Sequence, residues 1–326
     1  MAGEEWRKTW AIGRELVWGT DVAATRKMYF RDDSRLTRER EPRIHEFATG
    51  SRDNVRNISQ GPEKASGQVS LPVSAEILEL LEMGIKGAVA AAGAAATKTW
   101  TFTPSSTLDS ATLEWYDGVR GWQMVGSYVE SLKFAGKVDG ESLLTAELIG
   151  KAITQVAMTG GLTDRVPAVF EGWEAALAID AFGAVPGTTN IADTLIDWDV
   201  TIKNNYGRKY LGNNVNAVSA LPIGKITIQG KLKFEAAPAV ALTEFNNWDT
   251  GTKRIISLMF GHNALIGAGP DTEFVRVDIP GAWTAVDLGG NDNGTHVYEL
   301  SLNYVYDPTN TFGLQVVVQT ARTTVF

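Results

Sequence analysis

Apolar and polar residues alternate along most of the chain, which is the pattern of β-strands with one buried face. The alternation is clearest in the second half, at 196–202, 226–234, 298–306 and 314–318. The first half repeats it at 27–30, 36–47, 64–73, 98–103, 111–115, 122–134 and 142–150. These stretches predict a mainly β protein whose antiparallel sheets pack as a sandwich or barrel.

Two short stretches change to helical spacing. Ser74 is a candidate N-cap for a helix over 75–85, and Pro238 suits the first turn of a helix over 238–248. Each has apolar residues on one face only, so each is expected to lie against a sheet.

The two halves of the chain have the same order of elements. Gly67 and Gly230 lie half of the 326 residues apart, and each stands in an alternating strand that leads into a short helix. After the helices, we match 98–103, 111–115, 122–134 and 142–150 with 254–260, 273–279, 295–306 and 313–320. A repeat at this spacing predicts two tandem, similar antiparallel β-sandwich domains, each with one flanking helix. We expect them at 1–160 and 161–326, because Gly160, Gly161 and Pro167 interrupt the pattern between them.

A long loop is predicted at the same place in each half, between the second and third matched strands. The two loops cover 49–63 and 204–222. Loops of this length in a compact domain usually have a function. Their equivalent positions favour arms that reach a neighbouring subunit.

Composition narrows the classes of function. The chain has no cysteine, which excludes disulfides and thiol chemistry. Its net charge of −8 argues against tight binding to DNA. The one basic stretch, 31–56, interleaves arginines with glutamates and favours a solvated strand or a charged subunit contact. The longest apolar stretch, 84–96, is shorter than the roughly 20 residues of a membrane span, so we expect a soluble protein with no membrane segment.

Residues that could carry chemistry are scattered. His45, His262 and His296 have no metal-binding spacing, so we expect neither a metal nor a cofactor. Asp197 and Asp199 share one strand face, where a solvated surface is favoured over an acid–base pair. The Gly- and Asn-rich stretch 289–294 favours a hairpin turn over a calcium loop. No catalytic residue is assigned, and the chain is not expected to be an enzyme.

Ten tryptophans are many for this length. Trp100 and Trp198 alternate with core positions and are expected to be buried. We expect exposure at Trp18, Trp115, Trp122 and Trp283, where aromatic side chains favour subunit contacts over sugar stacking.

Several segments together resemble the tail tube, or major tail, proteins of long-tailed (siphovirus-type) bacteriophages. The opening of the chain, Gly13-Arg14-Glu15-Leu16-Val17-Trp18-Gly19-Thr20, is similar to the start of that family. The segments at 66–71, 131–134, 143–151, 199–205 and 230–234 resemble it as well. The resemblance covers most of the chain through short motifs.

The resemblance implies a structural virion protein. Such proteins form sandwiches with a flanking helix, and their sheets join edge to edge in rings that stack into the hollow tail tube. Family members usually form hexameric rings from one such domain, so a duplicated chain is expected to form pseudo-hexameric rings of three copies. The expected partners are other copies, the tape measure protein and tail-end proteins, after assembly in the host cytoplasm.

The tube places two further expectations on this chain. DNA is expected to slide through an acidic lumen without specific binding during ejection. The two long loops are placed to bridge successive rings, with ion-pair donors at Arg52, Arg56, Arg208 and Lys209.

Two alternatives remain open from the residues. The tryptophans and acidic loops suit a carbohydrate-binding or adhesin-like pair of β-sandwiches. A hydrolase that uses Asp197 and Asp199 is the weakest alternative, because no partner residue converges on them.

Overall fold

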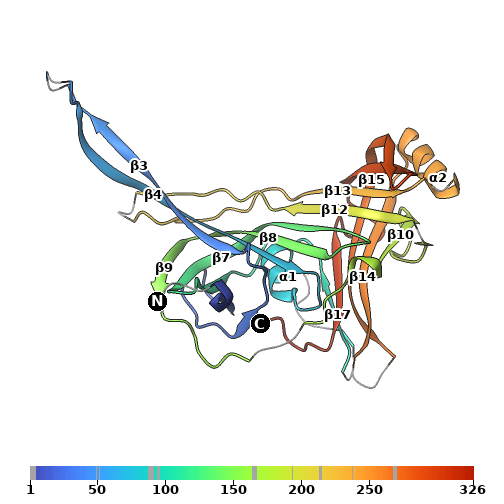
Figure 1. Cartoon of the computed structure of the whole chain (residues 1–326), viewed down its shortest axis with the longest axis horizontal. Helices are drawn as coiled ribbons and strands as arrows, with labels where there is room; N and C mark the ends of the chain where they lie inside the picture. The colour runs from blue at the N-terminus through green and yellow to red at the C-terminus, as the bar shows by residue number, and fades with distance from the viewer. Residues whose placement is uncertain are drawn as a thin grey trace.

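The computed structural model describes residues 5–48, 50, 52–86, 92–93, 96–163, 167–192, 194–212, 215–236, 238–266 and 270–326. Within them, antiparallel strands dominate, as predicted (Figure 1). The first half contains strands β1 (Thr9–Arg14), β2 (Arg26–Met28), β3 (Arg35–Glu46), β4 (Val55–Pro72), β5 (Lys98–Phe102), β6 (Ala111–Tyr116), β7 (Gly121–Lys137), β8 (Ser142–Gly150) and β9 (Ala152–Val156), with helix α1 (Leu78–Gly84) after β4.

The second half contains strands β10 (Ala175–Ala181), β11 (Asn190–Ile191), β12 (Leu195–Lys203), β13 (Thr227–Glu235), β14 (Arg254–Leu265), β15 (Thr272–Asp292), β16 (Thr295–Tyr304) and β17 (Gln315–Thr320), with helix α2 (Pro238–Asp249) after β13. Short 3-10 turns lie at η1 (Glu5–Arg7) and η2 (Gly172–Glu174). The helix and most strands of each half therefore lie where the sequence pattern predicts them.

The strand pairings of the two halves are the same. In the first half, the order β3–β4–β8–β7 forms one sheet and β2–β1–β6–β7–β9 the other. In the second half, β12–β13–β16–β15 and β11–β10–β14–β15–β17 repeat this arrangement. The long strands β7 and β15 belong to both sheets of their half, which is how each sandwich is held together.

The equivalence of Gly67 and Gly230 is confirmed by the register. Gly67 pairs with Leu36 on one side and Leu148 on the other, and Gly230 occupies the same place between Val200 and Leu302.

The predicted match of the strands after the helices is wrong by one strand. The pairings match β6 with β14, β7 with β15, β8 with β16 and β9 with β17, whereas we had matched 98–103 with 254–260. The reason is β5, whose strand partner in the described chain is β17 of the other half and which has no equivalent strand among the described residues of that half. Alternation reveals strands but not their partners, so an extra strand shifted the sequence match.

One sheet runs without a break through both halves. Strand β7 pairs with β12, which gives the order β3–β4–β8–β7–β12–β13–β16–β15, with four strands from each half. One face of this sheet is apolar and packs into a core that both halves share.

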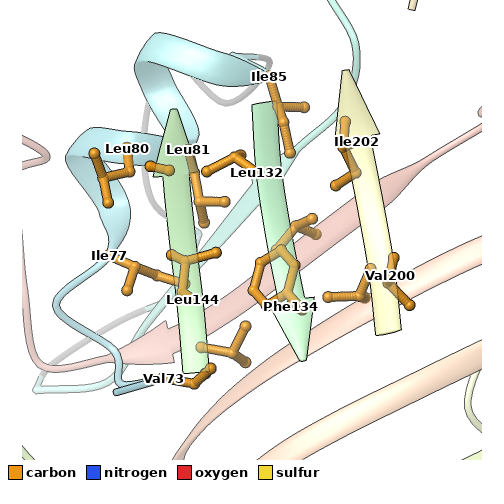
Figure 2. Packing of buried hydrophobic residues seen from close by; sticks show 14 of the residues in the cluster. Val73, Ile77, Leu80, Leu81, Ile85, Leu132, Phe134, Leu144, Val200 and Ile202 are labelled. Atoms are coloured by element: carbon orange, nitrogen blue, oxygen red, sulfur yellow. The ribbon is translucent and has the colours of Figure 1, made fainter. Parts of the chain in front are cut away.

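Helix α1 covers the apolar face where the two halves meet. Its Leu80 and Leu81 are buried, and Leu81 lies beside Leu132 of β7 (Figure 2). Ile85, directly after the helix, lies next to Ile202 of β12. Burying a side chain of this size contributes about 1.5–3 kcal/mol, so the helix is a substantial part of the joint. The helix begins after Ile77, not at Ser74, whose hydroxyl accepts a hydrogen bond from the N–H of Glu76 (3.3 Å).

Candidate assembly surfaces

The joint between the halves is a pairing of two strand edges within one chain. Strand β12 runs antiparallel to β7, with Val200 opposite Phe134 and Ile202 opposite Leu132 on the apolar face (Figure 2). On the polar face, Lys133 of β7 and Asp199 of β12 form a diagonal ion pair at 2.7 Å. Opposite charges at such cross-strand positions stabilise a sheet and fix its register.

Asn204 closes the end of this joint. Its buried side-chain amide donates hydrogen bonds to the carbonyl of Gly84 (2.8 Å) at the end of α1 and to that of Val129 (2.9 Å) in β7. Its backbone N–H donates to the carbonyl of Glu130 (2.9 Å), at a bulge in β7. One residue thus satisfies three backbone carbonyls and holds strand, helix and bulge together.

The polar face of the continuous sheet has both signs of charge. Besides Lys133 and Asp199, Lys231 and Glu299 form an ion pair at 2.8 Å across β13 and β16. Within these two pairs, the positive and negative charges neutralise each other, so neither lysine is left unpaired to hold a phosphate backbone.

Both ends of the continuous sheet have an open edge in the described chain. At one end, β3 pairs only with β4. At the other end, the C-terminal part of β15 pairs only with β16, and its Leu288 is 43% exposed. Unpaired edges attract further strands, and proteins that remain monomeric usually block such edges.

A β-hairpin arm projects from the sheet at its β3 edge (Figure 1). We use "arm" for the outer parts of β3 and β4 and the connection at 47–54. The prediction of a loop over 49–63 is therefore wrong, because β4 begins at Val55 and pairs antiparallel with β3. Ile44 and Ile58 lie opposite each other on the arm, and each is 59% exposed. An apolar cross-strand pair so far from the core forms an exposed apolar surface that the described part of the chain leaves uncovered.

Glu63 fixes the base of the arm. Its buried carboxylate accepts hydrogen bonds from Arg38 (2.8 Å), from Arg40 (2.6 Å) and from the N–H of Ile153 (3.0 Å). Burial alone would raise the pKa of Glu63, but these hydrogen bonds outweigh it and hold the pKa below its ordinary value. The charged residues of 31–56 thus lie on the paired strands β3 and β4, and two of the arginines, Arg38 and Arg40, bind the buried Glu63.

The second predicted loop, 204–222, lies at the equivalent place between β12 and β13, and its described residues have no strand ladder. It lies along the first half: the Tyr210 hydroxyl donates to the carbonyl of Glu63 (2.9 Å), and the N–H of Glu63 donates to the carbonyl of Asn216 (2.9 Å). The two equivalent connections have therefore folded differently.

The four predicted contact residues divide between these two connections. Arg52 lies exposed at the tip of the arm, and Arg56 lies exposed on β4 near it. Arg208 donates a hydrogen bond to the carbonyl of Ala65 (3.2 Å), so it lies against its own chain. Lys209 is exposed, and its backbone pairs with Ala220.

The chemical candidates take ordinary structural places. Asp199 is in the ion pair with Lys133, and burial raises the pKa of its neighbour Asp197. The turn between β15 and β16 is a hairpin closed by Asn293 and Gly294, both with positive φ, as expected. Among the described residues, no group of three or more His, Cys, Asp or Glu could hold a metal ion. No helix in that part of the chain is long and apolar enough to cross a membrane.

One prediction about the exposure of the tryptophans is wrong. Trp100 and Trp198 are buried as predicted, but so is Trp283, which is 4% exposed. Its indole N–H donates a hydrogen bond to Glu244 of α2 (2.7 Å), a partner that alternation could not indicate. Trp18, Trp115 and Trp122 are half-buried.

No curated protein matches the chain. The family model described as phage tail tube protein matches residues 6–296, which is most of the chain. Together with the mainly β double sandwich and its open sheet edges, this match shows that the chain belongs to the phage tail tube proteins, structural components of the virion tail.

Proposed function

We propose that three copies of this chain close into a ring and that the rings stack into the tail tube, a conduit for genome ejection, with no enzymatic role. One observation supports this most strongly. The edge-to-edge joint that a ring needs already exists once inside the chain, between β7 and β12, while β3 and β15 leave the same two kinds of edge open.

The division of the chain gives the number of copies. We propose that 1–160 and 161–326 are duplicated domains, because every strand pairing within the first half has a counterpart in the second. Each chain then supplies two equivalent units, and three chains supply the six of a ring built from single-domain relatives. Residues 164–166, next to this boundary, lie outside the described residues.

The bore is proposed to be lined by the polar face of the continuous sheet. This modifies the expected acidic lumen. The pairs Lys133–Asp199 and Lys231–Glu299 neutralise each other, so DNA would meet a polar wall of mixed charge. Such a wall provides little counterion release, which is the main source of non-specific DNA affinity.

The arm is proposed to make the contact between rings. Its exposed Ile44 and Ile58 offer an apolar patch, with Arg52 and Arg56 near the tip as charged donors to the next ring. Arg208 and Lys209, which we also predicted for this contact, would support it from the base of the arm. The tape measure protein and tail-end proteins are the proposed partners inside and at the end of the tube, after assembly in the host cytoplasm.

Negative-stain microscopy and light scattering of the purified protein test this function. We expect rings or tubes of uniform bore, with a ring mass of three chains. A protein that stays monomeric at all concentrations and is stabilised by added sugars would instead favour the carbohydrate-binding alternative.

A further inference from the structure

The joint inside the chain contains enough detail to predict the joint between chains. Strand β7 has a bulge between Val129 and Ser131, where it pairs with β8. Strand β15 has a bulge at the equivalent place, between Trp283 and Ala285, where it pairs with β16. The bulges align the two strands residue by residue as far as Lys133 and Asp287, so that Leu132 corresponds to Val286. Strand β15 then has a second irregularity, between Asp287 and Gly290, and Leu288 follows Asp287 as Phe134 follows Lys133.

The opposite edge aligns through the Gly67–Gly230 equivalence. Because Gly67 pairs with Leu36 and Gly230 pairs with Val200, Leu36 of β3 corresponds to Val200 of β12. One residue earlier in each strand, Arg35 corresponds to Asp199. Both side chains belong to the polar face of their sheet.

We propose that β15 of one copy pairs antiparallel with β3 of the next copy in the register of β7 and β12, and that Asp287 forms an ion pair there with Arg35 of the next copy. This proposal rests on the ring function given above and specifies its contact. In this register, Leu288 lies opposite Leu36 of the next copy, and Asp287 lies diagonal to Arg35.

Burial supports this register. Phe134, at the β7 position, is fully buried, with Val200 of β12 opposite it and Phe260 of β14 stacked on its ring, whereas the equivalent Leu288 is 43% exposed. The side chain is apolar in both places, but only the first has its neighbouring strand. A strand from another copy would cover Leu288 in the same way.

Charge gives the second line of support. The internal joint has a base on β7 and an acid on β12, Lys133 and Asp199. At the open edges the signs are exchanged, with an acid on β15 and a base on β3, Asp287 and Arg35. Both residues are exposed, and neither forms an ion pair within the described chain. In both joints, β7 with β12 and β15 with β3, a base on one edge thus meets an acid on the other.

The exchange of signs also selects the correct partner. If β3 of a second copy paired with β7, Arg35 would face Lys133, and if β12 paired with β15, Asp199 would face Asp287. Like charges at cross-strand positions repel. The arrangement therefore favours the ring over a domain-swapped pairing of the same strands.

Charge reversal tests the ion pair. We expect D287K and R35E each to raise the protein concentration needed for ring formation by about tenfold, which is about 1.4 kcal/mol, and D287K/R35E to restore it. The control is D139K, a reversal in the exposed turn between β7 and β8. Thermal melts establish that the single variants remain folded. Single variants that assemble like the wild type, or a double variant no better than either, would overturn the ion pair.

Cross-linking tests the register, and the chain has no native cysteine to interfere. Ser131 lies opposite Lys203 in the internal joint, so Ala285 and Glu39 of the next copy are the equivalent pair. We expect A285C/E39C to form disulfide-linked multimers on oxidation and A285C/T37C, two residues out of register, to form none. S131C/K203C should form its disulfide within a single chain. If the wild type makes rings but A285C/E39C does not cross-link, the register is wrong and the tube function stands; if the wild type makes no rings, the function itself fails.

Discussion

Glu63 connects three parts of the molecule through one carboxylate. Its carboxylate accepts hydrogen bonds from Arg38 and Arg40 of the arm and from Ile153 of β9. Its backbone contacts the 204–222 connection. A buried acid satisfied by several donors is costly to disturb, because the donors lose a charged acceptor. The direction of the arm therefore depends on the charge of a single residue.

We expect Glu63→Gln to lower the free energy of unfolding by about 2 kcal/mol and to loosen the arm. In the wild type, the depressed pKa of Glu63 gives a stabilisation that is complete above its ordinary value of 4.5 and is lost as the pH falls through the folded value. Urea unfolding and hydrogen exchange in β3 measure both effects. Glu39→Gln, at an exposed site on the same strand, is the control; equal behaviour of the two variants would contradict the role of Glu63.

Glu82 of α1 titrates in the opposite direction. The pKa of Glu82 is raised to about 7. Burial is the largest cause, and the hydrogen bond with Asp109 is the second. Asp109 keeps its charge because Lys86 (2.5 Å) and Arg14 pair with it. The two acids therefore share one proton beside the joint of the two halves.

We expect the wild type to lose roughly 2–3 kcal/mol of stability between pH 5 and pH 8 through Glu82. Its contribution is complete below the ordinary pKa of 4.5 and is lost as the pH rises through about 7, because the folded state holds the proton more tightly. Glu82→Gln should remove this slope, whereas Glu235→Gln, at an exposed site, should keep it. Unfolding midpoints at four pH values are the measurement, and an unchanged slope in Glu82→Gln would refute the assignment.

At the scale of elements, the role of the arm in stacking can be tested separately from ring formation. We expect the I44T/I58T double variant to form rings that fail to stack into long tubes, because the apolar contact is lost while the sheet edges are intact. The stability of the monomer should change by less than about 1 kcal/mol, since both side chains are exposed. Tube lengths in micrographs are the measurement, with V119T, an exposed site in the turn between β6 and β7, as control. Long tubes from I44T/I58T would exclude the arm as the contact between rings.

Elements were predictable where local pattern determines them. Strands such as β8 and β12 and the helix after Pro238 follow from alternation and turn residues. The outer part of β4 was predicted as a loop because its mostly polar residues show no alternation that would distinguish a solvated strand from a loop. The pairing of β5 with β17 could not be seen either, since it joins segments more than half the chain apart.

At the scale of the whole molecule, the repeated order of elements was visible in the sequence, but its consequence for the sheet was not. Gly67 and Gly230 indicate the repeat, yet nothing local shows that β7 and β12 join the halves into one sheet. The four residues predicted to contact another ring were chosen for charge and loop position. Among them, Arg208 donates a hydrogen bond to Ala65 of its own chain, where the 204–222 connection packs against β4.

The unmatched strand β5 has a consequence for symmetry. The four-strand unit of the continuous sheet occurs twice in each chain, so the proposed ring of three copies would have an inner wall with nearly sixfold symmetry. Strand β5 extends the second sheet of the second half, and among the described residues no strand pairs with β9 in the equivalent way. The outside of the tube would therefore have threefold symmetry, and a protein that binds there would find three attachment points in each ring, while DNA inside would meet six.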